Sequence, residues 1–286
     1  MLKENKVIMN QHKFKNISKH THTVHLTKSD KPPRVNALGV GVHAINMTAA
    51  VQLIDSAIRK GTKNYICVTG VHGIIEAQKD IQFRQILNNA FLNTPDGMPA
   101  VWVGKLQGFS KMQRVFGPDL MLEICKMSMQ KGYTHFLYGG NTGVAEELYL
   151  RLNSLVPGIN IVGTYSPPFR PLNKSEEAEL LNLVAHLKPD IFWVGLSTPK
   201  QEKFLAEYIH KLDTKVMIGV GAAFDIHVGR LLDASNWVKN FGLQWLHRLL
   251  QEPSRLWKRY LINNPIFLYK ISTQLLGLKK YKIENE

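Results

Sequence analysis

The residue of this sequence best suited to proton transfer is Asp96, in the segment Asn93-Thr-Pro-Asp-Gly-Met-Pro99. Two prolines and a glycine hold its carboxylate in a rigid turn at the end of a short apolar run. A carboxylate placed in this way can act as a general base, although aspartate is also a common turn residue. Arg114 precedes the helix-start sequence Gly117-Pro-Asp119, where its guanidinium is suited to clamp a phosphate.

Two glycine-rich segments follow apolar runs and could receive an anion on their backbone N–H groups. The first, Gly139-Gly-Asn-Thr-Gly143, opens a helical pattern, so Gly140, Asn141 and Gly143 are candidate diphosphate-binding residues. The second contains Phe224 where a dinucleotide site would carry its third glycine. Sharp turns also require glycine, so these segments by themselves fit a structural turn as well as an anion site.

A third loop segment, Gly195-Leu-Ser-Thr-Pro-Lys-Gln-Glu202, places a cation and an amide in the first turn of a predicted helix. Lys200 and Gln201 would then face the same edge of the fold as the glycine-rich segments and contact a substrate there. Glu202 near the helix start fits simple helix capping equally well.

Several familiar catalytic patterns do not occur in this sequence. There is no Asp-x-Asp, GxxxxGK[ST], HExxH or GxSxG sequence. The sequence therefore does not indicate a metal-chelating diphosphate site, a kinase, a zinc protease or a serine hydrolase. The two cysteines, Cys67 and Cys125, are too few for a disulfide framework or a four-ligand zinc site.

The elements that must position the candidate residues alternate in the order expected of an α/β protein. Ligands bind beyond the carboxyl ends of parallel strands, and the candidate residues follow predicted strands. We predict a Rossmann-like, mostly parallel sheet with helices on both faces, followed by a C-terminal amphipathic helical appendage. The predicted strands are Val35–Val42, Tyr65–Thr69, Phe91–Thr94, His135–Tyr138, Ile159–Thr164, Ile191–Leu196 and Val216–Val220, and the predicted helices are Thr48–Lys60, Asp119–Lys131, Gly143–Leu155, Ser175–Leu187 and Pro199–Lys211.

The net charge of +14 is concentrated at the two ends of the 286-residue chain. Residues 1–34 contain eight Lys or Arg and two acidic residues, and residues 237–286 contain nine and three. We therefore predict three parts: a basic disordered leader at 1–33, an α/β core at 34–236 and a basic, Trp-rich appendage at 237–286. Basic ends on a near-neutral core favour contact with an anionic surface, although solvated tails carry the same signature.

The appendage carries Trp237, Phe241, Trp245 and Leu249 at intervals of four residues, which predicts a single apolar helix stripe. A stripe rich in tryptophan and surrounded by cations suits a lipid surface, and it equally suits packing against the sheet. The segment Tyr260–Leu278 contains too many polar residues to span a bilayer.

Seven segments stand here in the order found in the WecG/TagA/CpsF family of bacterial glycosyltransferases, which the chain resembles over roughly residues Val35 to Pro265. The resemblance implies an inverting transferase that needs neither metal nor another cofactor. It implies a UDP-sugar donor, with N-acetylmannosamine or a related hexose or uronate, and a polyprenyl-diphosphate-linked sugar acceptor in surface polysaccharide or teichoic-acid-like synthesis. It also implies a peripheral protein on the anionic inner face of the bacterial cell membrane, and a homo-oligomer that rearranges there. The segments are TGVHGIIEAQ, TPDGMPAVWVGKLQG, RVFGPDLM, FLYGGNTGVAEEL, PDIFWVGLSTPKQEKF, GVGAAFD and GLQWLHRLLQEPSRLWKRY.

The resemblance assigns roles to particular residues. Asp96 matches the general base that deprotonates the acceptor hydroxyl, and Thr69, Arg114 and Gln201 match residues that line the sugar and diphosphate pocket. The appendage of the family places arginines over the departing diphosphate, where they stabilise its developing charge. In this chain those arginines are Arg248, Arg255 and Arg259.

Two departures from the family pattern concern the substrate site. Many members follow the threonine with a Leu-Asn-x-Glu type of sequence, whereas this chain has Gly70-Val-His-Gly73, which leaves the donor sugar open. A frequent Arg-Ala-Pro segment is replaced by Leu232-Asp-Ala-Ser235, which removes the contact that its arginine would make.

Two other classes of function stay open at this point. One is an oxidoreductase or epimerase that uses NAD or a nucleotide sugar, against which Phe224 counts. The other is a non-enzymatic basic adaptor for a membrane or nucleic acid, which predicts binding that falls steeply with salt. No nucleic-acid-binding motif supports the second class, and we expect no nucleic-acid partner.

Overall fold

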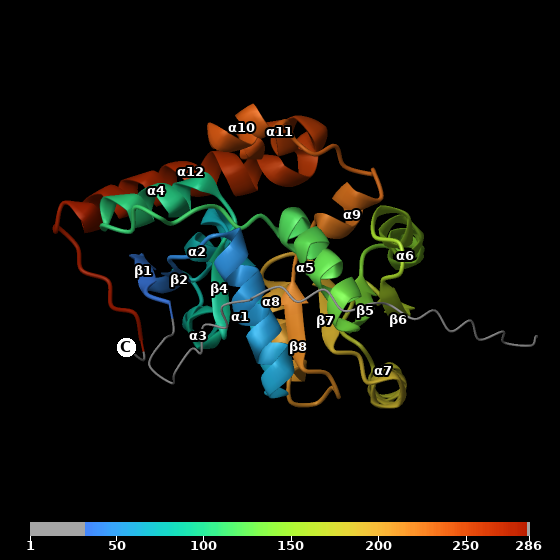
Figure 1. The fold of residues 1–286 in the computed structure, drawn as a ribbon. Helices are drawn as coiled ribbons and strands as arrows, with labels where there is room; N and C mark the ends of the chain where they lie inside the picture. The colour runs from blue at the N-terminus through green and yellow to red at the C-terminus, as the bar shows by residue number, and fades with distance from the viewer. Residues whose placement is uncertain (1–31, 285–286) are drawn as a thin grey trace, which may run out of the picture. The chain divides into compact units, whose positions relative to one another are not determined.

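A six-stranded parallel sheet lies at the centre of the computed structural model, which describes residues 32–284 (Figure 1). All five strand pairs are parallel, in the order β4-β3-β8-β7-β5-β6. The predicted mostly parallel sheet is confirmed. Its strands are β3 (Asn64–Thr69), β4 (Leu92–Pro95), β5 (Thr134–Gly139), β6 (Asn160–Tyr165), β7 (Ile191–Gly195) and β8 (Val216–Gly219).

Helices cover both faces of this sheet, as predicted. Neighbouring residues of a strand alternate between two apolar cores: Phe136 and Phe192 contribute to one, and Leu137 and Trp193 to the other. The second core is completed by α1 (Met47–Lys60), α5 (Gly117–Lys131), α6 (Val144–Leu155) and α9 (Ala223–His227). The first core is completed by α2 (Val71–Glu76), α3 (Ile81–Asn89), α4 (Met98–Leu106), α7 (Lys174–Leu187), α8 (Lys200–Tyr208) and α12 (Pro253–Leu275).

The predicted strand Val35–Val42 is wrong as a strand of the main sheet. The segment forms an antiparallel hairpin of β1 (Arg34–Ala37) and β2 (Val40–His43), which is a separate two-stranded sheet. The two connecting residues, Leu38 and Gly39, have φ values of 57° and 82°. Positive φ at both central positions is the conformation of a tight hairpin turn, and it reverses the chain.

The hairpin is joined to the C-terminal end of α12. The side-chain amide of Gln274 accepts from the backbone N–H of Leu38 at 2.8 Å and donates to the backbone oxygen of Asn36 at 2.7 Å. Phe267 and Ile271 of the same helix are buried in the first core. The end of α12 is therefore part of the packed body.

The predicted continuous stripe of the appendage is wrong. The chain forms two short helices, α10 (Asn236–Asn240) and α11 (Gln244–Gln251), and Gly242 with φ 71° lies between them. Trp237 and Phe241 are 63% and 70% exposed, so they do not pack on the sheet. Trp245 instead packs against Tyr260 of α12, with ring centroids 6.0 Å apart.

The described residues contain neither the predicted leader as a whole nor a helix suited to span a bilayer. The predicted leader at 1–33 lies almost entirely outside the described residues. Within residues 32–284, every helix is either too short or too polar to cross a membrane.

Candidate active site

The site begins where β3 and β4 end side by side. Thr69, the last residue of β3, pairs in register with Pro95, and its backbone oxygen accepts from the N–H of Asp96 at 3.1 Å. The side chain of Thr69 is buried, and its hydroxyl oxygen has no hydrogen-bond partner within the described residues. The parallel pairing therefore brings two predicted site residues, 27 positions apart in sequence, into direct contact.

The Asp96 carboxylate lies half-buried in a cationic environment. Its Oδ1 accepts from the backbone N–H of Gly117, at the start of α5, at 3.2 Å. Burial raises the pKa of Asp96 above its ordinary value, while the Gly117 N–H and the nearby guanidinium groups of Arg114, Arg259 and Arg248 oppose that rise. A carboxylate with a raised pKa is a better proton acceptor, which suits the predicted role of general base.

Arg114 is held in place by three neighbours. Its guanidinium donates to the Gln244 side chain of α11 at 2.8 Å, lies 3.7 Å from the Asp119 carboxylate and stacks 4.7 Å from the centre of the Phe116 ring. Asp119 lies in the first turn of α5, which begins at Gly117. Arg114 thus connects the start of α5 with the appendage.

The three appendage arginines differ in their ion pairing. Arg248 and Arg255 both donate to the Glu252 carboxylate at 2.7 Å. Arg259 has no carboxylate partner among the described residues, and its Nε is buried without a hydrogen bond. Burial lowers the pKa of Arg259. A partly buried guanidinium without a counter-charge is unfavourable, so this side chain is suited to an anionic ligand.

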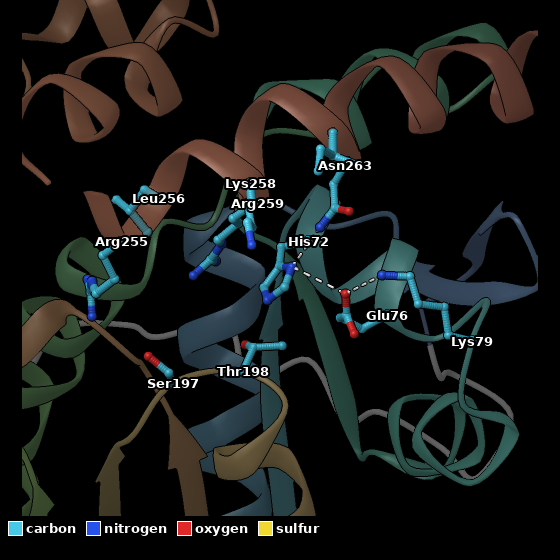
Figure 2. A pocket seen from close by; sticks show the side chains of 11 residues that line it. His72, Glu76, Lys79, Ser197, Thr198, Arg255, Leu256, Lys258, Arg259 and Asn263 are labelled. Carbon is cyan, nitrogen blue, oxygen red and sulfur yellow. Dashed lines mark hydrogen bonds and ion pairs between the residues drawn. The ribbon is translucent and has the colours of Figure 1, made fainter. Parts of the chain in front are cut away.

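A cleft of about 410 Å³ lies between α12, α2 and the loop that follows β7, and Figure 2 shows its side chains. Four of these side chains are cationic and one is acidic, so the cleft is electropositive. Asp96 does not line the cleft, although Arg259 both lines it and influences the pKa of Asp96. The lining residues are His72, Glu76, Lys79, Ser197, Thr198, Arg255, Leu256, Lys258, Arg259, Ile262 and Asn263.

Gln201 is buried, and both ends of its amide are bonded within the protein. Its Oε1 accepts from the N–H of Gly221 at 2.9 Å, and its Nε2 donates to Glu202 at 2.9 Å. Thr198 also donates to Glu202, at 2.8 Å. Gln201 therefore joins the loop after β8 to the start of α8, and its amide is committed to this internal network.

The remaining predicted site residues lie elsewhere on the same edge of the sheet. The N–H of Gly140 donates to the oxygen of Gly195 at 3.0 Å, and a Cβ on Gly140 would lie 2.6 Å from Val144, so packing requires a glycine at this position. Asn141 and Gly143 follow β5, which stands four strands from β4, or about 19 Å at about 4.8 Å per strand. Lys200, the first residue of α8, is exposed to solvent.

Sequence reasoning missed several residues of this site. His72 and Asn263, which face each other in the cleft, and Glu252, which binds two arginines, were not predicted. His72 stands three residues beyond a predicted strand end, a position that was available as a signal. Asn263 interrupts an apolar helical pattern, and a polar residue on a buried helix face is often there for a specific bond.

The chain is similar to one protein family and to named bacterial proteins. A profile described as the "Glycosyl transferase WecG/TagA/CpsF family" matches residues 35–281. A Bacillus spizizenii protein is 31% identical over 216 residues, which are 75% of this chain and 82% of that protein. A Staphylococcus aureus protein is 26% identical over 253 residues, which are 87% of this chain and 96% of that protein. Both are named N-acetylglucosaminyldiphosphoundecaprenol N-acetyl-beta-D-mannosaminyltransferase.

Proposed function

Because the chain belongs to the WecG/TagA/CpsF family and is therefore a glycosyltransferase, we propose that it moves a hexosyl group from a UDP-sugar to a polyprenyl-diphosphate-linked sugar. The observation that carries this proposal is Asp96, a half-buried carboxylate near three guanidinium groups at the ends of two parallel strands. The names of the relatives support an N-acetylmannosaminyl group and an N-acetylglucosaminyl acceptor on diphosphoundecaprenol. Such a product belongs to the synthesis of a surface polysaccharide or teichoic-acid-like polymer.

The proposed reaction is a single displacement with inversion. The acceptor hydroxyl attacks the anomeric carbon of the donor and transfers its proton to Asp96. The new carbon–oxygen bond forms as the bond from the anomeric carbon to the diphosphate breaks, and UDP leaves with both bonding electrons. The Gly117 N–H orients Asp96 by occupying one carboxylate oxygen.

Stabilisation of the departing diphosphate falls to arginine in this proposal. Arg259 has no internal counter-charge among the described residues, and Arg248 lies beside it. Fixed cations that face a developing negative charge lower the barrier for its formation. Within the described residues no group of three or more His, Cys, Asp or Glu side chains is placed to hold a metal ion. Because arginine side chains supply the positive charge at the leaving group in this proposal, we expect turnover to continue in EDTA.

The carboxyl-end edge of the sheet suggests how the bound donor is oriented. With the sugar beside Asp96, the nucleotide extends along the carboxyl ends of β8 and β7 toward the loop after β5. The chain leaves β5 toward β6 on one side and leaves β7 toward β8 on the other, so the strand order reverses between β5 and β7. Ligands of open α/β sheets bind at such a reversal. We propose that Gly140, Asn141 and Gly143, together with Lys200, contact the nucleotide end of the donor.

We further propose that the appendage rests on the anionic inner face of the cell membrane, where the lipid-linked acceptor resides. Exposed apolar side chains occur along α10, α11 and α12, among them Trp237, Phe241, Leu250 and Trp257. Lys258, which is also exposed, lies next to Trp257. Aromatic residues beside cations suit the boundary between lipid and water.

The alternative functions considered from sequence lose their support. Membership of a glycosyltransferase family argues against an oxidoreductase and against a non-enzymatic adaptor. Phe224, which occupies the third-glycine position, is fully buried, and a Cβ on Gly195 would lie 2.7 Å from its ring. The third glycine of a dinucleotide site lets the helix pack closely on the strand, and here the Phe224 ring fills that space.

The proposal is tested by incubating the full chain with a lipid-diphosphate-linked N-acetylglucosamine acceptor and individual UDP-sugars in EDTA, while UDP release is followed. The panel includes N-acetylmannosamine, N-acetylmannosaminuronate, glucose, glucuronate and galactose donors. Release with one donor and transfer of its sugar to the acceptor support the proposal. A folded, vesicle-bound protein that is silent with every donor contradicts it. Activity that returns only with magnesium or manganese contradicts metal independence.

A further inference from the structure

We infer that His72 and Asn263 form a positioning pair. The pair holds α12 in the rotation that directs Arg259 toward the proposed binding place of the donor diphosphate, which we call the anion site. The inference rests on the proposed function, because it gives the pair a purpose through Arg259. Figure 2 shows the two side chains facing each other below α12, and Arg259 lies one helical turn away from Asn263.

The contact between the pair has a defined direction. The Asn263 amide nitrogen lies 3.0 Å from His72 Nδ1. An amide nitrogen donates, so Nδ1 accepts and the ring proton resides on Nε2. Burial and then the Arg259 charge lower the pKa of His72 to about 4, which keeps the ring neutral and able to accept.

His72 also contacts the opposite wall of the cleft. A hydrogen bond links its ring to the backbone of Thr198, in the loop that follows β7. Glu76, 3.8 Å from the ring, is engaged by Lys79 at 2.9 Å. His72 therefore connects α12 with the strand-end loop and is fixed on both sides.

Asn263 is the polar member of the buried face of α12. It is 4% exposed, and the other buried residues of the helix are Leu256, Phe267 and Ile271. A buried amide is costly when its hydrogen bonds are lost, so rotations of the helix that separate it from His72 are disfavoured. A single buried asparagine fixes helix register in coiled coils for the same reason.

Arg259 depends on this rotation because its direction is not set by an ion pair. It lies four residues before Asn263, on the same face of the helix and about 6 Å along its axis. No carboxylate among the described residues binds it. The hydrogen bond between His72 and Asn263 therefore fixes the rotation of the helix face that carries Arg259, whose guanidinium lies 5.7 Å from the centre of the adjacent Tyr260 ring.

The test is a double-mutant cycle on UDP affinity, measured by titration calorimetry. We expect Arg259→Ala to weaken UDP binding by about tenfold or more and Asn263→Ala by about five- to tenfold. Because both changes act through one guanidinium, the double variant should bind UDP like Arg259→Ala alone. Asn264→Ala, at the adjacent half-buried asparagine, is the matched control and should bind UDP like the wild type.

A second set of variants separates positioning from folding. His72→Asn keeps an acceptor close to the place of Nδ1 and should retain UDP affinity, whereas His72→Leu should lose as much as Asn263→Ala. Thermal denaturation of each variant verifies the fold. Additive effects in the cycle, or wild-type affinity of Asn263→Ala, would overturn the positioning role alone. If Arg259→Ala bound UDP with wild-type affinity, both the role of Arg259 in binding the diphosphate and the positioning role of the pair would be wrong.

Discussion

Oδ1 of Asp96 accepts a hydrogen bond from the backbone N–H of Gly117 over 3.2 Å. The bond joins the end of β4 to the first turn of α5. The other oxygen, Oδ2, faces Gly70, and a Cβ added to Gly70 would lie 3.7 Å from Oδ2. One carboxylate oxygen is thereby held by the scaffold while the other is available to take a proton. The base is oriented by a backbone group, which side-chain substitution cannot remove directly.

The position of Gly117 is therefore sensitive to a single added methyl group. A Cβ on Gly117 would lie 3.2 Å from the backbone oxygen of Val220, which is tighter than ordinary contact. We expect Gly117→Ala to displace the N–H from Asp96 and lower kcat by about tenfold, with a smaller change in KM for the donor. Steady-state kinetics on lipid-linked acceptor measure this. An unchanged kcat would show that the bond does not matter for turnover.

Asp96→Asn should separate chemistry from binding. Asparagine keeps the acceptor for the Gly117 N–H and cannot take the proton of the acceptor hydroxyl, so turnover should fall by about 10²–10⁴-fold. UDP affinity should stay within about twofold of the wild type. Equal losses of turnover and UDP affinity would instead assign Asp96 a structural role.

The same substitution should stabilise the fold at neutral pH. Burial raises the pKa of Asp96, so the folded state binds this proton more tightly than the unfolded chain. Stability therefore falls as pH rises from about 3.9 through the raised value, and the penalty persists above it. The Tm of Asp96→Asn should exceed that of the wild type at pH 7.5, and the difference should shrink toward pH 4. A lower Tm for the variant at pH 7.5 would contradict this electrostatic account.

Membrane contact is testable without deleting the appendage, since α12 also supplies Phe267 and Ile271 to the core. We expect the double variant Trp237→Ser, Phe241→Ser to lose binding to phosphatidylglycerol vesicles in sedimentation assays, while its Tm stays unchanged. Phe169→Ser is a suitable control, because Phe169 is 85% exposed in the loop between β6 and α7. Undiminished vesicle binding by the double variant would move the lipid contact to another surface.

Local sequence patterns predicted much of this fold because they follow from short-range rules. Short apolar runs that alternate with helical patterns located the main strands, and the loops after them located Asp96 and Arg114. The hairpin at Leu38 was missed because a leucine rarely adopts positive φ. The stripe through Trp237 and Phe241 was predicted as continuous because periodicity does not register the break at Gly242.

The rest of the site depends on contacts between distant parts of the chain. His72 and Asn263 are 191 residues apart, and Arg114 and Gln244 are 130 residues apart. Each of these residues has an ordinary local setting, so only the packing of α12 and α11 over the strand ends reveals its partner. Gln201 shows the reverse case, since a local motif predicted a pocket residue whose amide is bonded inside the protein.

The bonds from Gln274 to the β1–β2 hairpin set an order of events during synthesis. Leu38 and Gln274 are 236 residues apart, and a ribosome adds about 5–20 residues per second. The hairpin therefore waits about 10–50 seconds after its own translation for the helix that completes its edge. During that interval the Leu38 N–H has no partner from α12 and stays open to solvent and to other nascent chains, so we expect this edge to benefit from a chaperone.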